Sequence, residues 1–140
     1  MSGYLIDSNV LSLLFKKQPD FSLLEKIRNT ILSGEQVFIS CITYYEIKKG
    51  LLTINALNEL KHFDIFCQTC EMIWLNNKFV FDEAARMYST LKKKGKLIND
   101  VDILIAAETK LKNLVLISND KDFENIADIK LLKLDQWMTS

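Results

Sequence analysis

The chain has 140 residues, of which 49% are apolar and 26% are charged, with 18 lysines and arginines against 18 aspartates and glutamates. A chain of this length and composition can bury one core, so we expect a single domain over residues 1–140 and exclude disorder and low complexity. The net charge of zero argues against binding of nucleic acid through bulk positive charge, although it leaves a local site open.

Cysteine usage and the absence of long apolar runs favour a soluble, cytoplasmic protein with no membrane partner. An odd number of cysteines is unusual in a secreted disulfide framework. Cys67 and Cys70 have CxxC spacing, but only Cys41 and His62 are available as further soft ligands. Two buried or half-buried thiols are therefore favoured over a zinc or redox site. No apolar run approaches the roughly 18 residues of a membrane span, and no basic segment of a signal peptide is visible at residues 1–4.

The first half of the chain alternates between strand-like runs and helical periods. Residues 4–6 predict a strand that ends at Asp7, and residues 10–15 have helical spacing. After a break that holds the only proline, residues 21–34 predict an amphipathic helix. A second strand is expected at residues 37–39.

The next elements are two helices and a third strand. Thr43 and Glu46 form a capping-box pattern, which predicts a helix that begins there and runs beyond Gly50. A further helix is expected over residues 56–67 and a strand over residues 72–75, in which Trp74 would belong to the core.

The last third predicts two more helices, a helical turn and two strands. Asp82 can cap a helix over residues 83–94 that stops at Gly95, and Asn99 or Asp100 can cap the next helix. In that second helix, Ile103, Ala106, Ala107 and Leu111 share one face. Strands are expected at residues 114–117 and 131–134, with a helical turn at residues 122–126 between them.

Strands separated by helices of this length predict βαβ units and a parallel sheet. No linker or change of composition divides the chain. We therefore expect an α/β fold, a three-layer α/β/α sandwich with a central, mainly parallel five-stranded sheet.

Acidic residues lie beside the predicted strand ends, where open parallel sheets place their sites. Asp7 follows the first strand, and Glu46 stands in the first turn of the helix after the second. Asp102 opens the helix before the fourth strand, and Asp120 follows that strand. Four carboxylates can thus meet at one edge of the sheet.

Carboxylates gathered in one pocket repel one another, and a divalent cation relieves that repulsion. Oxygen ligands favour Mg²⁺ or Mn²⁺, and such a metal can activate water for phosphodiester cleavage. Each acid also has a structural explanation, as a turn residue, a capping-box partner or a charge at a helix start. Asn99, Asp100 and Asp122 compete for the same roles.

Four segments together resemble the PIN-domain family. Tyr4-Leu5-Ile6-Asp7-Ser8-Asn9 is similar to the opening of these domains, and residues 39–50 resemble the second block, with Glu46 four places before Gly50. Residues 102–107, Asp-Ile-Leu-Ile-Ala-Ala, resemble the third block. Residues 117–123, Ile-Ser-Asn-Asp-Lys-Asp-Phe, resemble the fourth. The order is that of the family, and the length is that of VapC-type toxins.

The resemblance implies a metal-dependent endoribonuclease, usually the toxin of a type II toxin–antitoxin pair, a homodimer inhibited by its antitoxin. It implies that Asp7, Glu46 and Asp102 bind Mg²⁺ or Mn²⁺ and that Asp120 completes the acidic ring, with Asp122 as the alternative acid. Asn9 and Ser118 would orient the ligands or bound water.

RNA also requires cationic contacts. Among several lysine clusters, the group that leads into the Asp102 helix is the best candidate, although an exposed helix end explains it equally well: Lys92, Lys93, Lys94 and Lys96. Two other functions remain open. The chain can be a catalytically inactive PIN-like module that binds proteins, or an RNA-processing PIN nuclease outside a toxin–antitoxin pair.

Overall fold

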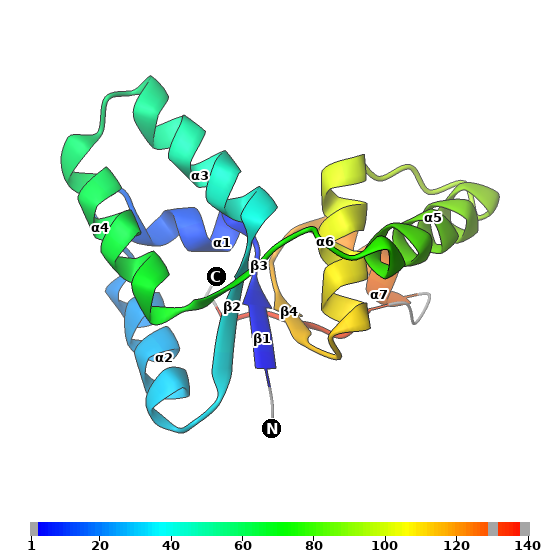
Figure 1. The fold of residues 1–140 in the computed structure, drawn as a ribbon, viewed down its shortest axis with the longest axis horizontal. Helices are drawn as coiled ribbons and strands as arrows, with labels where there is room; N and C mark the ends of the chain where they lie inside the picture. Colours follow the sequence, from blue (N-terminus) through cyan, green and yellow to red (C-terminus); the bar gives the residue numbers. More distant parts are fainter. Residues whose placement is uncertain (1–2, 129–131, 138–140) are drawn as a thin grey trace.

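A five-stranded, all-parallel sheet forms the centre of the protein and carries helices on both faces (Figure 1). The structure is a computed structural model that describes residues 3–128 and 132–137. The strands are β1 (Gly3–Ile6), β2 (Gln36–Ser40), β3 (Glu71–Ile73), β4 (Val115–Ile117) and β5 (Leu134–Asp135). The helices are α1 (Ser8–Leu11), the 3₁₀ helix η1 (Ser12–Leu14), α2 (Phe21–Leu32), α3 (Cys41–Thr53), α4 (Leu57–Thr69), α5 (Lys78–Lys93), α6 (Asp100–Leu111) and α7 (Lys121–Asp128). The predicted α/β/α sandwich is confirmed.

The strand order β3-β2-β1-β4-β5 reverses direction between β1 and β4. The chain first builds the sheet outward from β1 through β2 to β3, and then returns to the other side of β1. Open parallel sheets bind ligands in the crevice at such a switch point, outside the carboxyl ends of the strands. This topology singles out the residues that follow β1 and β4.

Side chains alternate between two cores, one on each face of the sheet. Leu5 and Leu116 pack with α5, α6 and α7, whereas Ile6, Ile39 and Ile117 pack with α1 to α4. Because both faces are covered, β1 and β4 at the centre of the sheet do not alternate with charged or strongly polar residues. Asp7 and Ser118, which directly follow the buried ends of β1 and β4, are the first polar side chains beyond them.

Several predicted boundaries are wrong, and each has a local cause. Helix α5 begins at Lys78 because the Asn77 side chain accepts a hydrogen bond from the Phe79 N–H, so Asp82 lies inside the helix and does not cap it. Strand β3 ends at Ile73, and Trp74 is 61% exposed instead of belonging to the core. Leu111 is 42% exposed at the end of α6, so it lies outside the buried face.

Near the C-terminus, α7 is a full helix where a single turn was predicted, and β5 comprises Leu134 and Asp135. Residue 131, where the fifth strand was expected to begin, lies outside the described residues. Gly95 ends the α5 region with a positive φ of 71°, as predicted for a helix stop. Within the described part of the chain, every helix is too short or too polar to cross a bilayer.

Candidate metal centre

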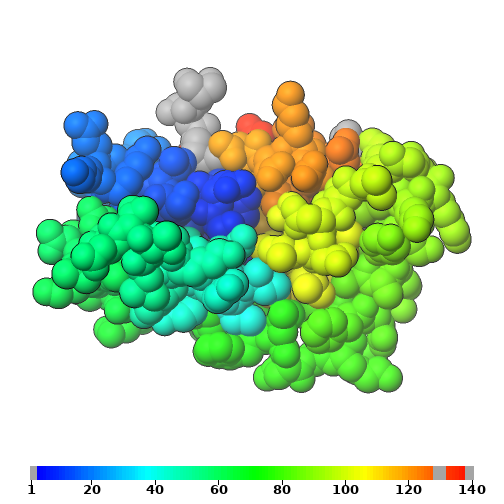
Figure 2. Space-filling view, turned by 90° about the horizontal axis from the view of Figure 1, so that it is seen from above, coloured from blue at the N-terminus to red at the C-terminus, as the bar shows by residue number. Residues whose placement is uncertain are grey.

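Four distant segments of the chain meet at the edge of the sheet where the strands end. Figure 2 looks onto this edge, and the blue, cyan, yellow and orange segments come together near the middle of the face. These are the regions around α1, the start of α3, the start of α6 and the start of α7. They carry the acids that the sequence predicted for the site.

Asp7 is held rigidly at the end of β1. It is 2% exposed, and its Oδ1 accepts a hydrogen bond of 2.9 Å from the Val10 N–H, which caps α1. Its Oδ2 accepts a hydrogen bond from the Ser118 hydroxyl. Strand register explains this pair, because Ile6 lies opposite Ile117 and the next residue of each strand therefore lies alongside the other.

Glu46 stands in the second turn of α3, so the predicted capping box is wrong. The helix starts one residue after Ser40, whose hydroxyl accepts a hydrogen bond from the Ile42 N–H. Thr43 is inside the first turn, and its buried hydroxyl has no hydrogen-bond partner among the described residues. The capping explanation of Glu46 is thereby removed.

One oxygen of the Glu46 carboxylate is buried without a hydrogen-bond donor beside it. Glu46 Oε1 has no hydrogen-bond partner within the described ranges, 3–128 and 132–137. A buried carboxylate oxygen left unpaired costs free energy, unless a cation or a bound molecule satisfies it. Glu46 therefore fits a metal ligand better than a structural acid.

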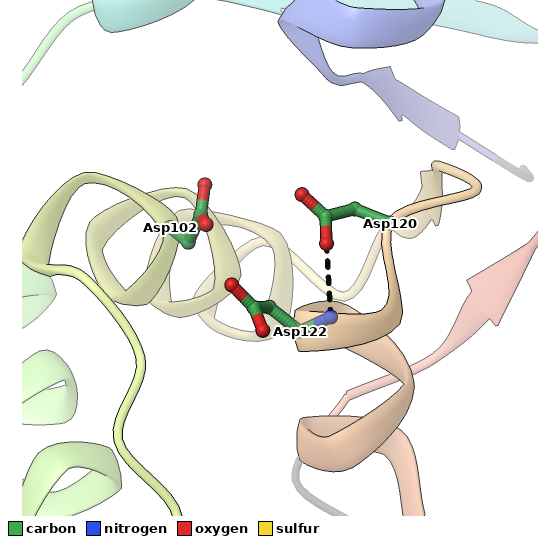
Figure 3. A group of neighbouring side chains, drawn as sticks. All are labelled: Asp102, Asp120 and Asp122. Carbon is green, nitrogen blue, oxygen red and sulfur yellow. Dashed lines mark hydrogen bonds between the residues drawn. The ribbon is translucent and has the colours of Figure 1, made fainter.

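Asp102, Asp120 and Asp122 point toward one another from α6 and from the start of α7 (Figure 3). Each offers one carboxylate oxygen, and these oxygens all lie within 4.8 Å of one another. The Asp122 N–H donates to Asp120 Oδ1 at 2.9 Å. Such a group of oxygens has the spacing and the chemistry of a site for a hard divalent cation.

Hydrogen bonds from neighbouring residues fix the orientation of this trio. Asn99 caps α6 by accepting from the Asp102 N–H, and its own amide donates to Asp102 Oδ2, both at 2.9 Å. The Asp120 N–H donates to the Ser118 hydroxyl oxygen at 3.0 Å. Because the same hydroxyl donates to Asp7, Ser118 connects the acid after β1 to the acid after β4.

Burial and mutual repulsion perturb two of the acids. Burial, followed by the charges of Asp120 and Glu46, raises the pKa of Asp7 to about 6. Burial and the charges of Asp120, Asp122 and Asp7 raise the pKa of Asp102 to about 6. These mutual effects place Asp7, Glu46 and the aspartate trio in one electrostatic cluster.

The remaining predicted residues fall into two groups. Ser118 is fully buried against Asp7, whereas Asn9 is exposed on α1 and lines a hollow beside Glu46. Lys96 donates to Asn125 Oδ1 at 3.3 Å, so it contacts α7 at the edge of the acidic region. The other three lysines of the group are exposed: Lys92, Lys93 and Lys94.

Sequence reasoning missed Glu108, which is fully buried in α6. Its Oε1 accepts a hydrogen bond of 3.1 Å from the Ser40 hydroxyl, and its Oε2 has no partner among the described residues. Burial raises the pKa of Glu108 to about 7. The available signal was a single acid inside the apolar run 103–109.

Burial disfavours the reactive thiolate form of both cysteines in the CxxC pair. Burial raises the pKa of both the Cys67 and the Cys70 thiol to about 11, so both stay protonated at neutral pH. This agrees with the expectation of two buried or half-buried thiols.

Comparisons with known proteins agree with the fold. A family model described as PIN domain matches residues 4–129. Ribonuclease VapC1 of Methanocaldococcus jannaschii is 31% identical to this chain over 136 residues, which cover 96% of this chain and 89% of the relative.

Solved toxin–antitoxin complexes have the same architecture. The structure of VapBC2 from Rickettsia felis bound to a DNA fragment from their promoter has a TM-score of 0.84 at 24% identity, covering 97% of this chain and 99% of that chain. VapBC-1 from nontypeable Haemophilus influenzae has a TM-score of 0.79 at 26% identity, covering 98% and 99%. On the match of the family model and the similarity to these relatives, the chain belongs to the PIN domain family.

Proposed function

We propose that the protein is a metal-dependent endoribonuclease that acts as the toxin of a type II toxin–antitoxin pair. The observation that carries this proposal is the acidic cluster at the switch point of the sheet, with three carboxylate oxygens within 4.8 Å of one another and an unpaired buried oxygen on Glu46. The ribonuclease name of the relatives and the VapBC complexes among the similar structures support it.

The donor set fits Mg²⁺ or Mn²⁺. Asp7, Glu46, Asp102 and Asp120 are the proposed metal ligands and catalytic residues, and Asp122 is the alternative fourth acid. All of them offer oxygen, which hard divalent cations prefer, and the cluster contains no histidine or cysteine. When bound, such a cation supplies a more acidic water and a positive charge for the phosphate.

The chain's own residues position this cluster through hydrogen bonds. The Val10 N–H and the Ser118 hydroxyl fix both oxygens of Asp7, which leaves the carboxylate a single orientation toward its neighbours. Asn99 donates to Asp102 Oδ2 and accepts from the Asp102 N–H, so it holds one oxygen of that carboxylate in place. We propose that Ser118 and Asn9 orient ligands and bound water, since Ser118 connects two acids and Asn9 lines the hollow that Glu46 also lines.

RNA, an antitoxin and a second copy of the chain are the proposed partners. The proposed RNA contacts are the exposed lysines at the end of α5 together with Lys96, which contacts α7 beside the acids: Lys92, Lys93, Lys94 and Lys96. The antitoxin is supported by the VapBC complexes, in which similar chains are bound to their partners. A homodimer in the cytoplasm completes the proposal.

Cleavage of RNA by the purified protein tests the activity. We expect cleavage with Mg²⁺ or Mn²⁺, no cleavage in excess EDTA, and none by Asp102→Asn. Asp100→Asn is the matched control, because Asp100 is an exposed acid in the same first turn of α6. Full activity of Asp102→Asn, or cleavage in excess chelator, would contradict the metal-dependent mechanism.

A metal titration separates the enzyme from an inactive protein-binding module. Binding of Mn²⁺ that depends on Asp102 supports the enzyme, whereas no binding supports the module. A neighbouring reading frame for a small DNA-binding protein supports a toxin, and its absence favours an RNA-processing nuclease.

A further inference from the structure

A hollow of about 350 Å³ lies between α1–η1 and α3, next to the acidic cluster. Ser8, Asn9 and Ser12 line it from the first side, and Glu46, Lys49 and Gly50 from the second. Its floor is formed by the buried apolar residues Phe15, Ile47 and Leu51. The volume is in the range of pockets that bind small molecules, about 300–1,000 Å³.

The hollow is continuous with the acids through two residues. Glu46 lines it and also raises the pKa of Asp7 through its charge. Asp7 caps α1, and the next two residues, Ser8 and Asn9, are part of the wall. A group seated in the hollow would therefore lie directly beside a phosphate held at the acidic cluster.

The walls offer hydrogen-bonding groups and a lysine, and an exposed aromatic ring outside the lining lies beside that lysine. The Ser12 hydroxyl donates to the Asn9 carbonyl, so its oxygen remains free to accept. Lys49 Nζ lies 4.9 Å from the centre of the Tyr45 ring, and Lys49 forms no ion pair with any described residue. Tyr45 is 62% exposed, which leaves its ring available for stacking.

Gly50 lines the hollow without a side chain of its own. It lies within α3, and a Cβ built on it would meet no atom within 4 Å, so the space beside it is empty. A side chain can therefore begin at this position without a clash of its Cβ.

We propose that this hollow binds the nucleobase next to the scissile phosphate of a single-stranded RNA substrate. An apolar floor accommodates the flat faces of a base, hydroxyl and amide groups contact its edges, and Lys49 with Tyr45 contacts the adjoining phosphate and base. The inference rests on the proposed ribonuclease function and deepens it, because it makes the hollow the determinant of nucleotide preference at the cut.

Filling the hollow is the direct test. Gly50→Phe should weaken binding of a short single-stranded RNA about tenfold, measured by fluorescence anisotropy in the Asp102→Asn background, where RNA stays intact. It should also change the nucleotide preference beside the cut, which sequencing of the new ends of a randomised RNA reveals in the otherwise unaltered enzyme. Leu52→Phe is the matched control, since Leu52 is exposed on the same helix and lines no part of the hollow.

A second variant guards against misfolding of the first. Lys49→Ala removes an exposed cation from the rim, and Lys61→Ala removes an equally exposed lysine from α4 as its control. Gly50→Phe and Lys49→Ala should both bind Mn²⁺ as tightly as the unaltered protein in calorimetry, because neither residue belongs to the acidic cluster.

The outcomes separate this inference from the proposed function. If Gly50→Phe and Lys49→Ala match their controls in RNA affinity and in nucleotide preference, the hollow does not bind a base, even though the enzyme cleaves RNA. A hollow that instead holds a segment of a protein partner would give this result. If the unaltered protein cleaves no RNA, the proposed function fails, and the anisotropy comparison still decides whether the hollow binds RNA.

Discussion

Replacing the Asp7 carboxylate with a neutral amide tests the charge balance of the acidic cluster. Asp7 is 2% exposed, and burial with neighbouring carboxylates raises its pKa from 3.8 to about 6. The folded protein therefore holds this proton more tightly than the unfolded chain does. Consequently, the metal-free protein loses stability as the pH rises from about 4 to about 6, and the loss is complete at pH 7.5.

The size of the effect follows from the pKa difference. A pKa raised from 3.8 to about 6 corresponds to a loss of about 3 kcal/mol of unfolding free energy at pH 7.5. Of this loss, about 1 kcal/mol is already present at pH 4.5. In Asp7→Asn the amide is neutral at both pH values and can still accept from the Val10 N–H. Its altered bond to Ser118 costs about 1 kcal/mol at either pH. Relative to the unaltered protein, the variant should gain about 2 kcal/mol between pH 4.5 and pH 7.5.

Urea unfolding in EDTA at the two pH values measures this gain. Asp100→Asn serves as the control, because Asp100 is exposed outside the cluster and its replacement should give no comparable pH-dependent gain. Equal differences between Asp7→Asn and the unaltered protein at pH 4.5 and pH 7.5 would refute the argument that burial and repulsion destabilise the ionised carboxylate.

Three further predictions concern other parts of the molecule. Mn²⁺ at about 100 times its dissociation constant should raise the unfolding free energy of the unaltered protein by about 2.7 kcal/mol, and calorimetric scans of Asp102→Asn should show a much smaller effect. Between pH 5 and pH 8, the unfolding free energy of Glu108→Gln should rise by about 2 kcal/mol relative to that of the unaltered protein in urea titrations. The reason is that burial raises the pKa of this fully buried acid to about 7, so the unaltered protein loses stability across that range. A difference that does not change with pH would contradict this prediction. Gly50→Ala should stabilise α3 by up to about 1 kcal/mol in thermal unfolding, whereas Gly34→Ala should destabilise, since the space beside both is open but only Gly34 has a positive φ, 91°.

The sequence predicted the fold because its strong signals are local. Apolar runs at residues 4–6, 37–39 and 114–117 match β1, β2 and β4, and the acids beside them lie at one sheet edge as expected. Periodicity also located the start of α2 at Phe21, although the helix ends at Leu32, two residues before the predicted end. These signals depend on burial on both sides of a parallel sheet, which leaves a continuous apolar run.

Helix starts were harder to predict because several residues near a boundary can cap. Thr43 and Glu46 match a capping box, yet Ser40 caps α3 because β2 ends there and its hydroxyl is free to turn back. Asn77 precedes Asp82 by more than a turn and takes the equivalent role for α5. Competition of this kind is decided by where the preceding strand stops, which is a tertiary property.

The sequence predicted that acids meet at this sheet edge, but it did not predict that Asp102, Asp120 and Asp122 form a trio. Sequence reasoning treated Asp120 and Asp122 as alternatives, whereas the start of α7 and the residue before it bring one carboxylate oxygen of each within 4.8 Å of an Asp102 oxygen. A spacing of two residues does not place side chains on one face of a regular helix. Here Asp120 precedes the helix and accepts from the Asp122 N–H, so the two carboxylates lie together.

The hydrogen bond from Ser118 to Asp7 joins residues 111 positions apart. Asp7 is therefore made early in synthesis, but its partner and the acids Asp120 and Asp122 come late. During translation, β1 stays without its β4 neighbour until most of the chain has been made, and the cluster is incomplete until then. A nascent chain that lacks β4 and the start of α7 is consequently unable to form the proposed centre.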